Sequence, residues 1–513
     1  MNQGNLYYVN IRSSAKKTSL IFRGLLLRIR FLYEKSIKIQ RGDKMEQMCK
    51  AVLKAATDAE VYHSSFCSAK EGAALMFSRD GEEFLGVSGP MADLFAGEDM
   101  GGWKCCPTDH KNRLVLNEVF PFTAPVSLGN KGTTFGMGDR LGFAGAAQVR
   151  AIKKVNVRPV LAQQSLRELT LTHRTLEEVI DRAAWAVFRE GYRLGYSCDG
   201  DHLKTVEEVQ KAIESGCTMI TLDCSLALNS GHAGIPDEEW ERLTYLQGTG
   251  PKDLGLGFSS DLLVKLHRIY DGALVLCKQV YFDCILLAPR AIDLELSLDE
   301  TEETTTPEAH YFVARELERS GVCITGLAPR FVGEFQKAIE YIGDISELER
   351  TMAVHAAIAK HFGYRLSLHS GSEKYSVLPV LMRTTGGNCH VKTSGTSWLE
   401  VVEVISRSDP ALYRRIHAEA LNGIEEAKKQ YVVHCDPSRV KPVESVPDAD
   451  LPRFLEQDQP DSRQLLHITY GRVLGIPDLK KDILDFLKKN RALYEAEAEE
   501  LYDRHFAALF GTI

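Results

Sequence analysis

Residues 195–223, GYSCDGDHLKTVEEVQKAIESGCTMITLD, contain the pattern that decides the fold. A short strand-like run, Gly195–Cys198, is followed by an amphipathic helical pattern over Thr205–Ser215 and by a second run, Thr218–Asp223. Two strands joined through a helix form a βαβ unit, in which the strands lie parallel. We therefore expect a mainly parallel sheet around this segment.

The same alternation continues along the chain after about residue 130. The other candidate strands are Leu141–Ala144, Arg158–Ala162, Val322–Thr325, Arg365–His369, Cys389–Lys392 and Leu465–Thr469, and the other helical patterns are Thr175–Glu190, Glu334–Ile342 and Leu348–Phe362. Eight strands that alternate with helices predict an α/β fold, a (β/α)8 TIM-like barrel. A doubly wound open sheet is the alternative. No G-x-G-x-x-G motif opens a helix after a strand, which disfavours a nicotinamide-binding fold.

Three regions flank or interrupt the predicted barrel of residues 131–513. Residues 45–130 contain Gly, Pro and Asp-rich turns and few long periods, so we interpret them as an N-terminal cap. Residues 295–308 are acidic and Thr-rich, which is typical of a solvated surface insertion. Residues 430–465 are rich in Pro, Asp and Val and are expected to be irregular.

The first 44 residues differ in charge from the rest of the chain. They carry ten Lys or Arg and two acidic residues, a net charge of +8, whereas the remainder has a net charge of −16. The codons for 41–45, Arg-Gly-Asp-Lys-Met, can hold a ribosome-binding site before a start codon. We therefore expect a mis-assigned start and translation from Met45; a disordered tail and a targeting or membrane-surface helix are the alternatives.

Composition excludes several functional classes. Of 513 residues, 44% are hydrophobic and 26% are charged, and the net charge is −8, so binding to nucleic acid through bulk charge is not expected. No apolar stretch reaches the roughly 18 residues of a membrane-spanning helix. The twelve Cys form no C-x-x-C pair, which argues against zinc ribbons and thioredoxin-like sites and favours a reducing, cytoplasmic setting.

Histidines occur at the ends of the predicted strands, where a parallel barrel carries its catalytic groups. His202 follows the strand ending at Cys198, His369 ends the strand Arg365–His369, and His390 lies in Cys389–Lys392. Two strand-end histidines and an Asp-His pair predict a metal site, because imidazole and carboxylate ligands suit Zn²⁺, Mn²⁺, Ni²⁺ or Co²⁺. The alternative is that each is a hydrogen-bonded core histidine, and His467 is a rival ligand.

Carboxylates and cations accompany these histidines. Asp201 and Glu334 are candidate acid–base residues, although each could instead stabilise a helix N-terminus. The cations are Arg140, Arg167, Arg330, Lys374 and Lys392, and they predict an anionic substrate unless solvent or nearby acids neutralise them.

Seven segments, in order over about residues 136–471, resemble the tagaturonate epimerase family. They are Gly136-Met-Gly-Asp-Arg-Leu-Gly, Ala162-Gln-Gln-Ser-Leu-Arg-Glu, Asp199-Gly-Asp-His-Leu-Lys-Thr, Leu327-Ala-Pro-Arg-Phe-Val-Gly-Glu-Phe, Ser367-Leu-His-Ser-Gly-Ser-Glu-Lys, His390-Val-Lys-Thr-Ser-Gly-Thr and Leu466-His-Ile-Thr-Tyr-Gly. The resemblance implies an isomerase that interconverts tagaturonate and fructuronate in hexuronate breakdown. It also implies a barrel, a divalent metal cation and no nucleotide cofactor. The family pattern often has Ala where this chain has Gly200, and the 295–308 segment is unfamiliar in it.

The two ketouronates differ at the hydroxyl carbon β to the ketone, where the carbonyl does not acidify the hydrogen. Retro-aldol cleavage and re-formation of the bond between the α and β carbons would invert this centre, and we favour it over transfer and return of a hydride. In this hypothesis the metal ligands are His202, His369 and His390, and the acid–base pair is Glu334 and Asp201. Gln164 and Asp139 hold sugar hydroxyls, Arg140 contributes positive charge, and Arg330, Lys374 or Lys392 binds the carboxylate.

Other functions are compatible with the same residues. A uronate isomerase would use similar ligands but transfer a proton α to the carbonyl, and a metal-dependent aldolase would release its fragments. A non-catalytic sugar-acid sensor would need a partner-binding or DNA-binding module, which the sequence lacks. The expected partner is a small sugar acid, and neither nucleic acid nor membrane is expected. The sequence leaves the oligomeric state open, a homo-oligomer included.

Overall fold

The computed structural model describes residues 43–511 except 57, 70–71, 230–239, 241–242, 244–245, 247–253, 301–302, 394 and 396. The chain forms two compact units, Met1–Thr108 and Asp109–Ile513. The expectation of a basic extension therefore lies mostly outside the described residues, although residues 43–55 form a helix.

The first unit is built on an antiparallel sheet with the strand order β1-β2-β3-β5-β4. Its strands are β1 (Glu60–Ala69), β2 (Gly72–Arg79), β3 (Glu82–Ser88), β4 (Glu98–Asp99) and β5 (Trp103–Pro107). Asp80 and Gly81 join β2 to β3 with positive φ angles of 54° and 76°, as a two-residue hairpin turn requires. The sequence placed the end of the N-terminal region at residue 130, whereas this unit ends at Thr108.

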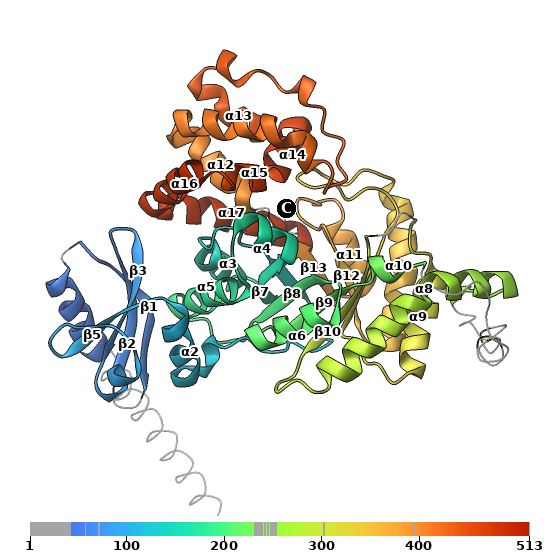
Figure 1. Cartoon of the computed structure of the whole chain (residues 1–513), viewed down its shortest axis with the longest axis horizontal. Helices are drawn as coiled ribbons and strands as arrows, with labels where there is room; N and C mark the ends of the chain where they lie inside the picture. The colour runs from blue at the N-terminus through green and yellow to red at the C-terminus, as the bar shows by residue number, and fades with distance from the viewer. Residues whose placement is uncertain are drawn as a thin grey trace, which may run out of the picture. The chain divides into compact units, whose positions relative to one another are not determined.

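The second unit is a closed barrel of eight parallel strands, which confirms the predicted fold (Figure 1). The strands are β6 (Thr134–Met137), β7 (Arg158–Ser165), β8 (Ser197–Leu203), β9 (Met219–Asp223), β10 (Asp293–Leu298), β11 (Gly326–Pro329), β12 (Arg365–Leu368) and β13 (Cys389–Thr393). β13 pairs with β6, and β9 pairs with β10, so the ring is complete.

Helices surround the barrel and connect its strands. They are α2 (His110–Val119), α3 (Gly145–Ile152), α4 (Leu166–Thr172), α5 (Leu176–Arg189), α6 (Val206–Ser215), α8 (Ser260–Val280), α9 (Pro307–Arg319), α10 (Ile345–Phe362) and α11 (Leu378–Thr385). The predicted starts of α5 and α6 are confirmed, because Thr175 and Thr205 each cap their helix through a reciprocal contact with the Glu three residues later. No helix among the described residues is long and apolar enough to cross a membrane.

A further group of helices follows the last strand. It contains α12 (Ser397–Ser408), α13 (Pro410–Ala427), α14 (Pro460–Ile468), α15 (Tyr470–Leu474), α16 (Pro477–Lys489) and α17 (Arg491–Phe510). These helices share a core around Trp398 and Tyr413, and α15 packs beside α4 at the carboxyl end of β7 (Figure 1). Short 3₁₀ turns at Pro437–Arg439, Val443–Ser445 and Asp448–Leu455 occupy the predicted irregular segment.

Two predicted strands are wrong. Leu141–Ala144 forms the turn before α3, where the Asp139 carboxylate accepts hydrogen bonds from the backbone N–H groups of this turn. Leu465–Thr469 lies largely within α14. The sequence did not reveal this helix because its residues are buried on all sides, so its apolar residues show no helical periodicity.

Two barrel strands escaped prediction, and both carry residues that are unusual in strands. β6 contains Gly136, whose missing Cβ leaves room for the Gln163 side chain, since a Cβ there would lie 1.7 Å from Gln163 Oε1. β10 contains Glu295, which is only 1% exposed. The interpretation of residues 295–308 as a surface insertion is therefore wrong at its start, where the chain forms a central strand.

Two further elements are displaced. The strand expected at Val322–Thr325 begins instead at Gly326, because Val322 closes the end of α9 by donating a hydrogen bond to the Leu317 carbonyl. The expected helix Glu334–Ile342 is a loop, whose ends pair through two backbone hydrogen bonds between Glu334 and Ile342.

Candidate active site

The carboxyl ends of the barrel strands open into a cavity of about 740 Å³. Its wall includes Ser165, Asp201, His202, Pro329, His369 and Lys392, from the ends of five strands. Four residues that follow α13 also line it: Gln430, Tyr431, Val432 and His434. This position agrees with the general rule that barrel enzymes place their reacting groups at the carboxyl ends of the strands.

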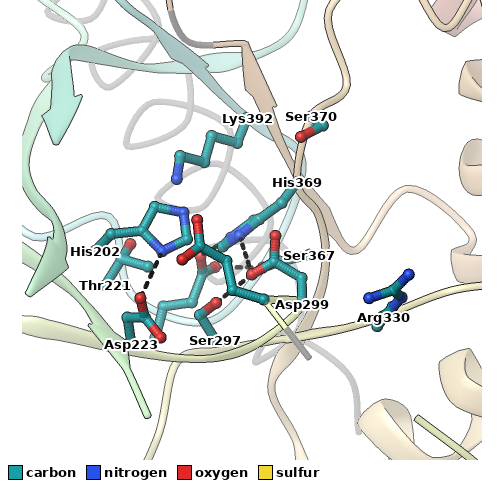
Figure 2. A network of polar contacts seen from close by, with 12 residues as sticks. His202, Thr221, Asp223, Ser297, Asp299, Arg330, Ser367, His369, Ser370 and Lys392 are labelled. Carbon is teal, nitrogen blue, oxygen red and sulfur yellow. Dashed lines mark hydrogen bonds and ion pairs between the residues drawn. The ribbon is translucent and has the colours of Figure 1, made fainter. Parts of the chain in front are cut away.

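His202, Asp299 and His369 converge within the cavity, as Figure 2 shows. One ligand atom of each lies within 4.8 Å of the others. The two imidazole rings meet edge to face, 5.3 Å apart at their centroids. His202 has a φ angle of 54°, a backbone conformation that is rare outside glycine and often found at functional sites. Two imidazoles and one carboxylate form a donor set suited to a divalent cation.

Carboxylates fix the position of the His369 ring. Its Nδ1 lies 3.0 Å from Asp299 Oδ1, and its Nε2 lies 2.8 Å from Glu295 Oε1. Burial alone would lower the pKa of His369, but these two carboxylates raise it to about 9. Glu295 contacts Nε2, the ring nitrogen on the side away from Asp299. In many proteins a carboxylate in this position orients a metal-ligating histidine.

His202 has a similar partner at a longer distance. Its Nδ1 lies 3.6 Å from Asp223 Oδ2, and the Lys204 ammonium lies 3.0 Å from the same oxygen. Although burial opposes ionisation, the contacts with His202 and Lys204 hold the pKa of Asp223 well below its usual range. Asp223 is therefore ionised at neutral pH.

His390, the third predicted ligand, does not join this cluster. Its Nδ1 lies 2.9 Å from Thr134 Oγ1, and its Nε2 lies 3.2 Å from Gln163 Nε2, inside the barrel. Burial lowers the pKa of His390 to about 4, so the ring is neutral. The rival His467 lies in α14, beside a cavity of about 10 Å³.

The two predicted acid–base residues both line the cavity but differ in their surroundings. Asp201 is buried, and its Oδ1 lies 2.5 Å from the Lys392 ammonium. Burial alone would raise the pKa of Asp201, but Lys392 and His202 lower it. Glu334 is exposed, accepts a hydrogen bond from the Gln336 amide and lies 3.5 Å from His434 Nε2.

Three residues predicted to contact substrate have other partners and do not line the cavity. Gln164 accepts a hydrogen bond of 3.3 Å from Arg174. Asp139 accepts from backbone N–H groups before α3, at 2.8 Å from both Gly142 and Ala144. The Lys374 ammonium donates to the carbonyls of Gln336, Ile339 and Ser372, so it holds the 334–342 loop in place.

The predicted cations that do line the cavity are Arg140, Arg167, Arg330 and Lys392. Arg140 is buried, forms two hydrogen bonds with Glu168 and stacks on Tyr470 at 3.6 Å. Lys392 is neutralised by Asp201. Arg330 lies apart from the histidine cluster (Figure 2).

Sequence reasoning missed Asp299, Glu295 and Lys337 as parts of the site. A signal for the first two was available, because Glu295, Ser297 and Asp299 alternate with leucines at the strand period of two. Lys337 lies in the 334–342 loop, where the expected helix gave no reason to direct it into the cavity.

Comparisons with known proteins identify the family of the chain. A sequence model of the tagaturonate epimerase family matches residues 62–509. The chain belongs to the tagaturonate epimerase family. It is therefore an isomerase-class enzyme, an epimerase.

Several members of this family are similar over most of the chain. The tagaturonate/fructuronate epimerase of Thermotoga maritima is 40% identical over 423 residues, which cover 79% of this chain and 86% of that protein. The native crystal structure of the fructuronate-tagaturonate epimerase from Cohnella laeviribosi is 39% identical with a TM-score of 0.86, over 91% of this chain and 99% of that one. A form of that enzyme complexed with one glycerol is 40% identical with a TM-score of 0.82, at the same coverage.

Proposed function

We propose that this epimerase interconverts D-tagaturonate and D-fructuronate at the hydroxyl carbon β to the ketone, in hexuronate catabolism. The observation that carries the proposal is the His202–Asp299–His369 cluster, which faces a cavity that also holds cations without carboxylate partners. Family membership indicates the reaction class, and the cations favour an anionic sugar over a neutral one.

A divalent cation fits this cluster. The donor atoms of His202, Asp299 and His369 already converge, and a Glu295 carboxylate oxygen contacts His369 Nε2. Such a donor set suits Zn²⁺, Mn²⁺, Ni²⁺ or Co²⁺. When bound, the ion supplies Lewis acidity to the ketone oxygen and its neighbouring hydroxyl.

The chain's own residues then move the proton of the β-hydroxyl. In the retro-aldol direction, the hydroxyl proton passes to an Asp201 carboxylate oxygen while the bond between the α and β carbons breaks. This leaves an aldehyde and an enediolate. The aldehyde turns and the bond re-forms on its other face, which leaves an alkoxide at the β carbon. The acid–base pair of Asp201 and Glu334 then returns the one proton to this alkoxide oxygen. Lys392 keeps Asp201 ionised and therefore able to accept the proton.

Proton NMR of the purified, metal-reconstituted protein with tagaturonate in D₂O tests this proposal, with an EDTA-treated sample as the control. We expect metal-dependent formation of fructuronate without deuterium on carbon. Deuterium next to the carbonyl would indicate an enolising isomerase instead. Accumulation of free three-carbon fragments would indicate an aldolase, and no turnover with any of the four metals would refute the proposed reaction.

A further inference from the structure

Three acidic residues that line the cavity each have a cationic partner, whereas three of its cations have no carboxylate partner. Glu168 pairs with Arg140, Asp201 with Lys392, and Asp299 with His369. In the part of the chain that the structure describes, no carboxylate oxygen lies within 4.0 Å of a charged nitrogen of Arg167, Arg330 or Lys337, although all three line the cavity. Positive charge without a partner at a ligand cavity is suited to an anion.

Two of these cations, Arg167 and Lys337, are held by the same segment of chain. Arg167 donates to the Gln430 carbonyl at 3.1 Å and stacks on the Tyr431 ring at 4.7 Å. On the other side, the His434 backbone N–H donates to the Gln336 side chain at 2.9 Å, directly before Lys337. Residues 430–434 therefore connect the two cations at one end of the cavity.

The Lys337 ammonium is also tied to the histidine cluster. It donates to Ser370 Oγ at 3.1 Å, and Ser370 follows His369 directly. Burial, with the nearby cations Lys392 and Arg167, lowers the pKa of Lys337 to about 8. An anion beside Lys337 would relieve this repulsion and favour its charged form.

We propose that Arg167 and Lys337 together bind the substrate carboxylate and so set a preference for sugar acids over neutral ketohexoses. This inference rests on the proposed function, and it names the part of the substrate that the end of the cavity recognises. Arg167 offers a planar, two-pronged donor, and Lys337 offers a compact charge between that donor and the histidine cluster. In this arrangement the ketone end of the sugar faces His202 and His369, and the acid end faces residues 430–434.

Binding of an inert sugar acid tests the inference without any reaction. Gluconate and its neutral counterpart sorbitol are titrated calorimetrically into metal-loaded wild type, Lys337→Met, Arg167→Met and Lys337→Arg, with Lys360→Met as the control for an exposed lysine. We expect both methionine variants to bind gluconate about tenfold to a hundredfold more weakly, with sorbitol unaffected. Lys337→Arg keeps the charge and should restore most of the affinity.

Three binding results would overturn the inference: wild type that binds gluconate no tighter than sorbitol, methionine variants that bind gluconate normally, or Arg330→Met as the variant that loses it. Kinetics with tagaturonate then separate binding from chemistry, because loss of an anchor raises KM more than it lowers kcat. An equal loss of kcat on tagaturonate and on neutral tagatose would make Lys337 a catalytic group and would also overturn it. Gluconate binding that depends on Lys337, without any turnover of tagaturonate, would refute the proposed function alone.

Discussion

Replacement of Glu295 by glutamine tests whether the barrel interior holds His369 ready for a cation. Glu295 is 1% exposed, its Oε1 lies 2.8 Å from His369 Nε2, and its other oxygen accepts a hydrogen bond from Ser367. Burial alone would raise its pKa, but His390 and His369 lower it from 4.5 to about 2. The contacts with His369 and Ser367 therefore favour the ionised carboxylate, and neutral glutamine cannot reproduce its charge.

We expect Glu295→Gln to weaken binding of the divalent cation by about tenfold to a hundredfold, the usual cost of removing a carboxylate behind a metal-ligating histidine. Ser367→Ala is the matched control, because it removes a neutral contact to the same carboxylate and leaves the charge in place. Competition with a chromogenic chelator at pH 7.5 measures both dissociation constants, after near-UV circular dichroism has shown native packing. A dissociation constant for Glu295→Gln within twofold of wild type, or an equal loss in Ser367→Ala, would refute the reasoning.

Three further predictions follow from the same structure. His369→Ala should abolish cation binding and lower kcat/KM by about a hundredfold or more, whereas His390→Gln should keep the cation; the same chelator competition distinguishes them, and loss of the cation in both would place His390 among the ligands. Asp139→Ala should lower stability by about 1–2 kcal/mol, because three backbone N–H groups lose their acceptor, and should leave KM unchanged; a raised KM with an unchanged melting temperature would instead make Asp139 a substrate contact. Burial lowers the pKa of His355 to about 4 from an unfolded value near 6.5, so stability should fall by up to about 3 kcal/mol as the pH drops from 6.5 towards 4. Urea midpoints between pH 4.5 and 7.5 should show a shallower slope in His355→Gln, although buried histidines such as His390 and His505 maintain part of it, and an unchanged slope would contradict the assignment.

The sequence predicted the barrel because enough strand–helix alternation survives in it. Arg158–Ala162, Thr218–Asp223, Arg365–His369 and Cys389–Lys392 all lie at barrel strands, with helices between them. Their apolar outward residues meet those helices, so the usual hydrophobic signal is present. Leu465–Thr469 failed for the opposite reason, because a helix buried on all sides has the composition of a buried strand.

The candidate site was predicted in part, and tertiary contacts explain the rest. Strand ends pointed to His202, His369, Asp201 and Lys392, all of which line the cavity. The side chain of Gln164 points to Arg174 instead, because neighbouring residues of a strand face opposite sides and Gln163 takes the inner position. The sequence periodicity predicted a helix over residues 334–342, but this segment is a loop. The path of the loop brings Lys337 to the cavity.

The inner face of the barrel explains why strands β6 and β10 were hard to recognise. Barrel interiors are usually filled with branched apolar side chains, but here Gln163, Asp199, Thr221, Glu295 and His390 face one another. Asp199 accepts hydrogen bonds from Gln163 and Thr221 at 3.0 and 2.8 Å, and burial raises its pKa to about 7.

Such an interior costs free energy of desolvation, which the outward face must offset by packing apolar side chains against the helices. The two faces of each strand are therefore under different demands: the outer face stabilises the fold, and the inner face holds the groups that carry the chemistry. Substitution of an inward residue that contacts the histidine cluster, such as Glu295, should consequently alter cation binding and turnover more than it alters stability. Outward substitutions such as Leu296→Ala, by contrast, should cost about 2–5 kcal/mol of stability with little direct effect on the site.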